Sequence, residues 1–104
     1  MIYDQQDDTL KLIRGLVTGE VVEVELSGTA SRQMERCDLN LADVLYVMRH
    51  ITSLRRHGQW YGCYVVEGAD VDGAHVAVVI EPPSHKNTRL RLLNIGRLEV
   101  TRHV

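Results

Sequence analysis

The stretch from Ser27 to Met48, SGTASRQMERCDLNLADVLYVM, predicts two short helices joined by a tight corner. In its first half, Ala30 and Met34 are four residues apart, a spacing that places both side chains on one face of a helix. In its second half, Asn40 suits the N-cap position of a helix. After Asn40, apolar residues recur at helical spacing at Leu41, Val44, Leu45, Met48 and Ile51. Residues 37–39 are predicted to form the corner.

Outside this stretch the pattern of apolar residues predicts one more helix and several strands. A helix is expected over residues 8–17, where Gly19 would end it. A half-buried strand is expected over 20–26, because apolar and acidic residues alternate there. Further strands are expected over 59–67, 74–81 and 88–95, with an edge strand over 97–101 and a turn at 68–73.

This order of elements predicts an α+β fold. The N-terminal helices should pack on one face of a three- to five-stranded, mainly antiparallel sheet. The 104 residues are interpreted as a single domain, 1–104, in which 1–6 form a loose end.

The charge distribution argues against general affinity for nucleic acid but leaves one basic segment. The net charge is −2, whereas nucleic-acid-binding domains are usually basic overall. Within residues 49–57, however, Arg49, Arg55 and Arg56 occur without any acidic residue. These three arginines are candidate nucleic-acid-binding residues. The alternative is a solvated helix end whose cations lie at the negative end of the helix dipole.

The sequence predicts no metal and no cofactor. Cys37 and Cys63 are too few for a disulfide framework and lack the spacing of a zinc site. Asp70 and Asp72 lie in a turn that lacks the other ligands of a calcium-binding loop. Neither a secretory signal nor a stretch of membrane-spanning length is found, which favours a cytoplasmic protein without membrane contact.

Several short motifs resemble a widespread bacterial domain family of unknown function. That family typically reads Ser-x-His-Ala, then Arg-Met-x-x-Arg, then a helix beginning Ile-x-x-x-Asp-Val, followed by a hairpin and a final strand. The corresponding segments here are Ser27–Ala30, Arg32–Arg36, Asn40–Val44, Tyr64–Gly68 and Val76–Ile80. The family occurs in toxin–antitoxin loci, mobile elements and polymorphic toxins, and is linked by fold analogy to barnase and RelE-like ribonucleases.

The resemblance implies a toxin-like domain that acts on RNA. Arg32 and Arg36 match the arginines of the family, and guanidinium groups bind phosphate oxygens well. Where the family usually has histidine, this chain has Thr29, which cannot act as a general base near neutral pH. The resemblance therefore also implies that the activity is degenerate or uses another group.

A metal-independent ribonuclease needs a base for the 2′-hydroxyl, an acid for the leaving 5′-oxygen and cations for the phosphate. Arg32 and Arg36 are the candidate cations, and His57, His75 and Tyr61 are the candidate proton-transfer groups. Each of these three has the alternative of an ordinary surface or half-buried residue.

Two hypotheses follow from the sequence. The first is a ribonuclease-like toxin domain whose partner is RNA. The second is a non-catalytic interaction or regulatory module of a phage or mobile element, whose partner is an antitoxin-like or host protein. Convergence of the arginines with a histidine or tyrosine on one concave surface would favour the first hypothesis.

Overall fold

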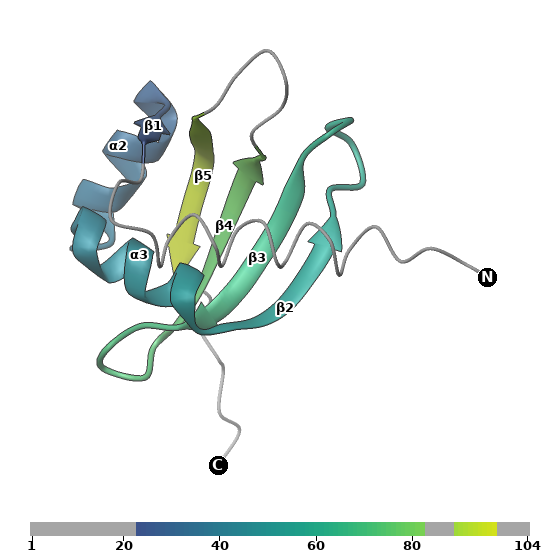
Figure 1. The fold of residues 1–104 in the computed structure, drawn as a ribbon. Coiled ribbons are helices and arrows are strands. Elements are labelled where there is room, and N and C mark those ends of the chain that lie inside the picture. The colour runs from purple at the N-terminus through teal and green to yellow at the C-terminus, as the bar shows by residue number, and fades with distance from the viewer. Residues whose placement is uncertain (1–22, 83–88, 98–104) are drawn as a thin grey trace.

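The computed structural model describes residues 23–82 and 89–97, and their elements form two layers (Figure 1). In chain order the elements are β1 (Val24–Leu26), α2 (Gly28–Arg36), α3 (Leu41–Arg49), β2 (Ile51–Arg56), β3 (Tyr64–Ala69), β4 (His75–Glu81) and β5 (Leu90–Arg97). The α+β class predicted from the sequence is therefore confirmed.

The described strands form one five-stranded sheet in the order β1-β5-β4-β3-β2. The pairs β2–β3, β3–β4 and β4–β5 are antiparallel, as predicted, whereas β1 pairs with β5 in parallel, so the sheet is mixed. The parallel pair arises because α2, α3 and the other three strands lie between β1 and β5 along the chain, and this long excursion brings the chain back in the original direction.

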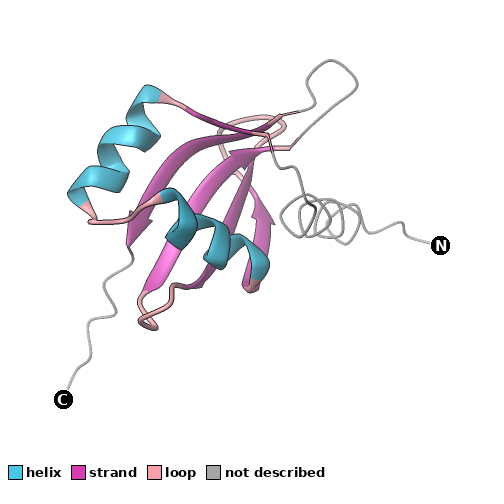
Figure 2. Cartoon of the chain, turned by 60° about the vertical axis from the view of Figure 1, so that its left-hand side comes forward, coloured by secondary structure: helices cyan, strands magenta, loops and turns pink. Residues whose placement is uncertain are grey.

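Helices α2 and α3 cover one face of this sheet (Figure 2). Helix α2 lies against β5 and β1, while α3 lies against β3. Alternate strand residues point into the layer between sheet and helices, as the pleat of a strand requires. The fully buried side chains of this core include Val44, Val47, Met48, Val66, Val76, Val78, Ile80, Leu90 and Leu92.

Helix α2 begins where Ser27 joins it to the sheet. The Ser27 hydroxyl accepts a hydrogen bond from the Ala30 backbone N–H at 3.0 Å and donates one to the Leu93 carbonyl at 2.7 Å. Ala30 and Met34 are buried, which confirms the predicted apolar face. Asp38, at the corner after α2, has a positive φ of 54°, a conformation that short polar side chains tolerate.

Helix α3 begins with the predicted cap but ends earlier than predicted. Asn40 and Asp43 form a capping box, in which each side chain accepts a hydrogen bond from the other's backbone N–H. The helix stops at Arg49, and the next residue but one, Ile51, opens β2. The interpretation of residues 49–57 as a solvated helix end fits Arg49 and His50, the last residue and the C-cap of α3, but is wrong for Ile51–Arg56, which forms a strand paired with β3.

Other boundaries differ from the sequence predictions by a few residues. The strand predicted over 59–67 begins only at Tyr64, since Gln59–Cys63 form the loop between β2 and β3, and it continues to Ala69. The strand predicted over 74–81 is confirmed as His75–Glu81. The helix predicted over 8–17, and all but Arg97 of the edge strand predicted over 97–101, lie outside the described residues. None of the described helices is long and apolar enough to span a membrane.

A close contact between α3 and β3 yields a test of this packing. A Cβ added to Gly68 would lie 2.8 Å from the backbone oxygen of His50 and 3.2 Å from Cγ1 of Val47. We expect Gly68→Ala to lower the free energy of unfolding by about 2–3 kcal/mol, because backbone cannot yield as a flexible side chain would. Chemical denaturation of the purified variant measures this loss.

Gly96→Ala is the matched control for this substitution. Gly96 is also a strand glycine, but among the described residues no atom beyond its own chain neighbours lies within 4 Å of the position its Cβ would take. We expect the free energy of unfolding of Gly96→Ala to stay within about 1 kcal/mol of that of the parent protein. Equal losses for both variants would contradict the packing argument.

Candidate functional site

Three neighbouring strands each place one chemically active side chain in the same cluster. Arg55 on β2, Glu67 on β3 and His75 on β4 form what we call the Glu67 cluster. Nη1 of Arg55 lies 3.1 Å from Oε1 of Glu67, and Nε2 of His75 lies 3.8 Å from Oε2. Glu67 therefore has a basic group beside each of its two carboxylate oxygens.

The strand register explains why these residues meet. Val66 and Val76 point into the core, so their neighbours Glu67 and His75 point to the second face of the sheet, opposite α2 and α3. Arg55 pairs with Val65 and His75 pairs with Ala69, so each lies diagonally across from Glu67. Diagonal neighbours on adjacent antiparallel strands are within reach of long side chains.

Burial distinguishes Glu67 from its partners. Its side chain is 17% exposed, against 53% for Arg55 and 35% for His75. The carboxylate is therefore held inside the cluster, while both bases extend toward solvent. This arrangement presents a guanidinium, a carboxylate and an imidazole on one surface, which are groups that bind phosphate and transfer protons.

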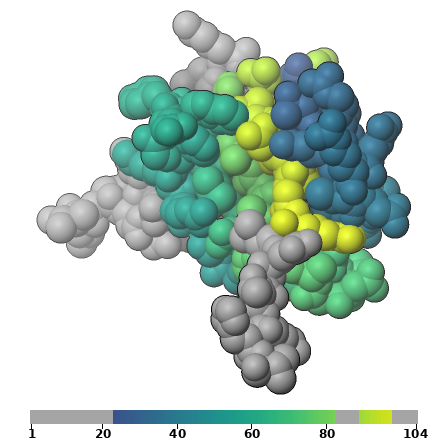
Figure 3. Space-filling view, turned by 180° about the vertical axis from the view of Figure 1, so that it is seen from behind, coloured from purple at the N-terminus to yellow at the C-terminus, as the bar shows by residue number. Residues whose placement is uncertain are grey.

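A second ionic cluster on the same face has no imidazole. Nε of Arg91 lies 3.6 Å from Oε2 of Glu25, and Nη1 of Arg91 lies 3.2 Å from Oε2 of Glu81. Arg91 therefore links β1, β5 and β4. Seen from behind, β5 (yellow) and β4 (green) reach the molecular surface (Figure 3). We call this group the Arg91 cluster. Like the Glu67 cluster it joins guanidinium and carboxylate groups across neighbouring strands, but it has two carboxylates and no imidazole.

The loop between β2 and β3 is organised around His57. Its Nδ1 accepts hydrogen bonds from the backbone N–H groups of Gln59 at 3.1 Å and Trp60 at 3.0 Å. Its ring also stacks on Trp60, with 4.8 Å between ring centroids. His57, a predicted proton-transfer residue, thus uses one ring nitrogen to hold the loop.

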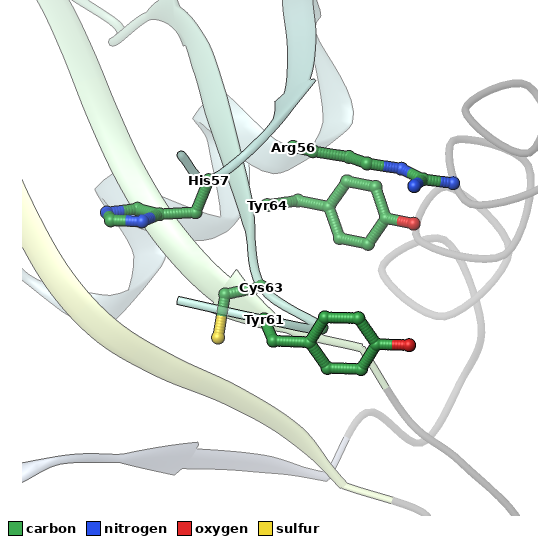
Figure 4. Close-up of a pocket in the computed structure, with 6 residues that line it drawn as sticks. Arg56, His57, Tyr61, Cys63 and Tyr64 are labelled. Carbon is green, nitrogen blue, oxygen red and sulfur yellow. The ribbon is translucent and has the colours of Figure 1, made fainter. Parts of the chain in front are cut away.

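A pocket of about 200 Å³ lies beside this loop. It is lined by Arg56, His57, Tyr61, Gly62, Cys63 and Tyr64. Arg56, Tyr64 and Tyr61 extend to the same side, whereas His57 points the other way (Figure 4). Tyr61 is fully exposed, and Trp60 is 42% exposed. The pocket therefore brings together three of the predicted residues, Arg56, His57 and Tyr61, without directing His57 at the tyrosine hydroxyls.

The predicted arginines of α2 lie apart from both of these groups. Arg32 and Arg36 are exposed on the side of α2 opposite the buried Ala30 and Met34, and they share that side with Thr29. Helix α2 lies over β5 and β1, and β5 is three strand spacings, about 14 Å, from β2. The arginines thus do not converge with His57, His75 or Tyr61. Arg49, at the end of α3, also lies outside the Glu67 cluster.

Glu67 was not among the residues predicted from the sequence, although both of its partners were. Arg55 was predicted to bind nucleic acid and His75 to transfer protons, because only the strand register shows that the two side chains meet at Glu67. Within the described ranges, no group of three histidine, cysteine or acidic residues is placed to hold a metal ion. No protein-family model, curated protein or solved structure matches this chain.

Cys63 borders the pocket and has a perturbed thiol. Burial raises its pKa, and the nearby carboxylate of Glu81 raises it further, while Arg91 acts in the opposite direction. Because the folded state holds the thiol proton more tightly, this group favours folding at neutral pH. That contribution is lost as the pH rises through the raised pKa of the folded protein.

We expect the two thiols to react at different rates with a thiol-specific disulfide reagent at pH 8. Cys37 is partly exposed and should be labelled first, while the buried Cys63 should react slowly. Glu81→Gln should speed the slow phase, since it removes a carboxylate that raises the Cys63 pKa. Stopped-flow absorbance with Cys63→Ser as the assignment control measures both phases. Equal rates in the parent protein would contradict this assignment.

Proposed function

We propose that this chain is a small ribonuclease-like domain that cleaves RNA without a metal ion through Arg55, Glu67 and His75. The observation that carries the proposal is the meeting of these three groups on the second face of the sheet. The resemblance to a family of toxin domains supports the same reading. The proposal moves the reacting centre away from α2, so Thr29 is no obstacle to activity.

The three groups match the needs of an RNA transesterification. Glu67 accepts the proton of the 2′-hydroxyl as the 2′-oxygen attacks phosphorus. Protonated His75 gives its proton to the 5′-oxygen as the bond from that oxygen to phosphorus breaks. Arg55 binds the phosphate oxygens, on which negative charge grows. The products are a 2′,3′-cyclic phosphate and a free 5′-hydroxyl.

The substrate-free geometry is consistent with this division of roles. Glu67 is flanked by two positive or protonatable groups, so the cluster balances its charge while no phosphate is present. An entering phosphate can take over the contacts of the more exposed Arg55 and His75. The carboxylate oxygens of Glu67 would then be released from Arg55 and His75 and would lie beside the 2′-hydroxyl of the sugar, which is the position that a general base needs.

Glu67→Gln, His75→Ala and Arg55→Ala should each reduce cleavage of a fluorophore–quencher RNA oligonucleotide about 100-fold or more in the presence of EDTA. General acid–base catalysis contributes about 10²–10⁴-fold, and loss of a phosphate-binding cation is comparable. Initial cleavage rates of the purified proteins measure the effect. The oligonucleotide with 2′-deoxyribose at the cleavage position should remain intact, because it has no attacking hydroxyl.

The Arg91 cluster supplies matched controls. Glu81→Gln and Arg91→Ala alter an ionic cluster of guanidinium and carboxylate groups on the same face, but they leave the Glu67 cluster in place. Both controls should cleave at the parent rate, which also excludes a contaminating nuclease from the purification. Loss of cleavage in the controls, or unchanged cleavage by His75→Ala, would overturn the proposal.

A second candidate function is a protein-binding module that uses α2. It is favoured by the outward side of this helix, where Thr29, Arg32 and Arg36 are exposed. Among the described residues neither arginine has an ion-pair partner, and arginine is enriched at protein interfaces. An acidic protein, such as an antitoxin-like inhibitor, is the partner that this surface would suit.

The double variant Arg32→Ala, Arg36→Ala separates the two candidates. Under the ribonuclease proposal it should cleave RNA within about threefold of the parent rate, because α2 and the Glu67 cluster lie on opposite faces of the sheet. Under the second candidate, the parent protein cleaves nothing, and the double variant loses a partner captured by the parent. Cleavage assays and pull-down from the native host lysate, run in parallel, distinguish these results.

A further inference from the structure

We infer that the tip of the β2–β3 hairpin is a platform on which an unpaired nucleobase of the RNA substrate stacks. The platform consists of Trp60 and Tyr61 and the pocket beside them. This inference rests on the proposed ribonuclease function, because it assigns a second binding site to the same substrate. It also gives the domain a preference for single-stranded over paired RNA.

The tip is held in shape without help from Tyr61. His57 accepts two backbone N–H groups, and its own backbone N–H donates to the Cys63 carbonyl at 2.9 Å. The Cys63 N–H donates in turn to the Trp60 carbonyl at 3.1 Å. Gly62 completes the turn with a φ of 80°, a conformation that favours glycine. Tyr61 is therefore presented on a loop that is already ordered.

The exposure of Tyr61 has no explanation in packing. Its side chain is fully exposed, whereas the neighbouring Trp60 stacks on His57. Because the turn is already ordered, little conformational entropy is lost when a planar group stacks on this exposed aromatic ring. The pocket next to it, about 200 Å³, is smaller than those that hold drug-sized ligands. It suits a single planar base rather than a folded ligand.

The charge around the tip favours nucleic acid over protein as the occupant. From Arg49 to Val66 the chain contains three arginines and no acidic residue, although the whole chain is acidic. Arg56 borders the pocket on the same side as the two tyrosine rings (Figure 4). Positive charge interleaved with exposed aromatic rings is the arrangement that binds single strands without sequence preference.

The platform and the Glu67 cluster belong to the same hairpin. Glu67 is four residues along β3 from Cys63, which borders the pocket, and this separation spans roughly 13 Å of strand. Tyr64 and its partner Arg56 share the sheet face of the buried Val66, whereas Glu67 points to the other face. A single strand that passes round the tip can therefore stack a base on Tyr61 and continue on the second face to place a phosphate at Glu67. A rigid duplex, whose bases are stacked on one another, could not use the tip.

Trp60 is the only tryptophan in the sequence and reports directly on this site. We expect a short single-stranded DNA oligonucleotide to quench its fluorescence, and DNA separates binding from cleavage because it lacks the 2′-hydroxyl. Tyr61→Ala should raise the Kd about tenfold, and Tyr61→Phe should keep the parent Kd, since stacking needs the ring and not the hydroxyl. A duplex of the same sequence should bind more weakly than the single strand.

Val71→Ala is the matched control, because Val71 is an exposed apolar residue on the β3–β4 turn at the opposite end of β3. It should leave the Kd unchanged. An unchanged Kd for Tyr61→Ala, equal affinity for the duplex, or no quenching at all would each overturn the platform. Thermal unfolding should be the same for both variants, since neither side chain is buried.

The two proposals fail separately. Quenching that depends on Tyr61 in a protein that cleaves no RNA supports the platform and overturns the ribonuclease. Cleavage that depends on His75, with full affinity and rate in Tyr61→Ala, supports the ribonuclease and overturns the platform.

Discussion

The close approach of α3 to β3 at Gly68 is the constraint on which the two-layer arrangement depends. The His50 carbonyl and Val47 occupy the space that a side chain at position 68 would need. Because α3 ends there and β2 begins two residues later, the contact also fixes where β2 starts along β3. A register shift between Ile51 and Ser53 then pairs Arg55 with Val65, which places Arg55 diagonally across from Glu67 on the other face. The glycine contact and this shift together determine which charged groups meet there.

The second face carries charge in two clusters whose chemistry differs. Each has carboxylate and guanidinium groups from neighbouring strands, and such pairs at partly exposed sites contribute little to stability. A purely structural role would therefore be served equally by either cluster. The imidazole of His75 is the difference between them, and it is the group to which the proposal assigns the role of proton donor beside the base Glu67.

Local signals predicted the helices well and the site poorly. The cap at Asn40 and the buried pair Ala30 and Met34 are readable because helices depend on residues three or four apart. Strand β2 was missed because Ile51–Arg56 has little alternation, and its pairing with β3 decides its conformation. The Glu67 cluster depends on the register of three strands, which no spacing within one segment reveals. The role of His57 as a loop acceptor, by contrast, depends on backbone N–H groups only two and three residues away.

The position of β5 in the sheet has a consequence for synthesis on the ribosome. In the described part of the chain, β1 pairs with Leu90, Arg91 and Leu92, more than sixty residues later, and α2 rests on the same strand. Until β5 emerges from the exit tunnel, β1 and α2 have no surface to cover, while the β2–β4 meander can already pair. The Glu67 cluster belongs to that meander. The reacting groups can therefore assemble on the nascent chain before the domain is complete.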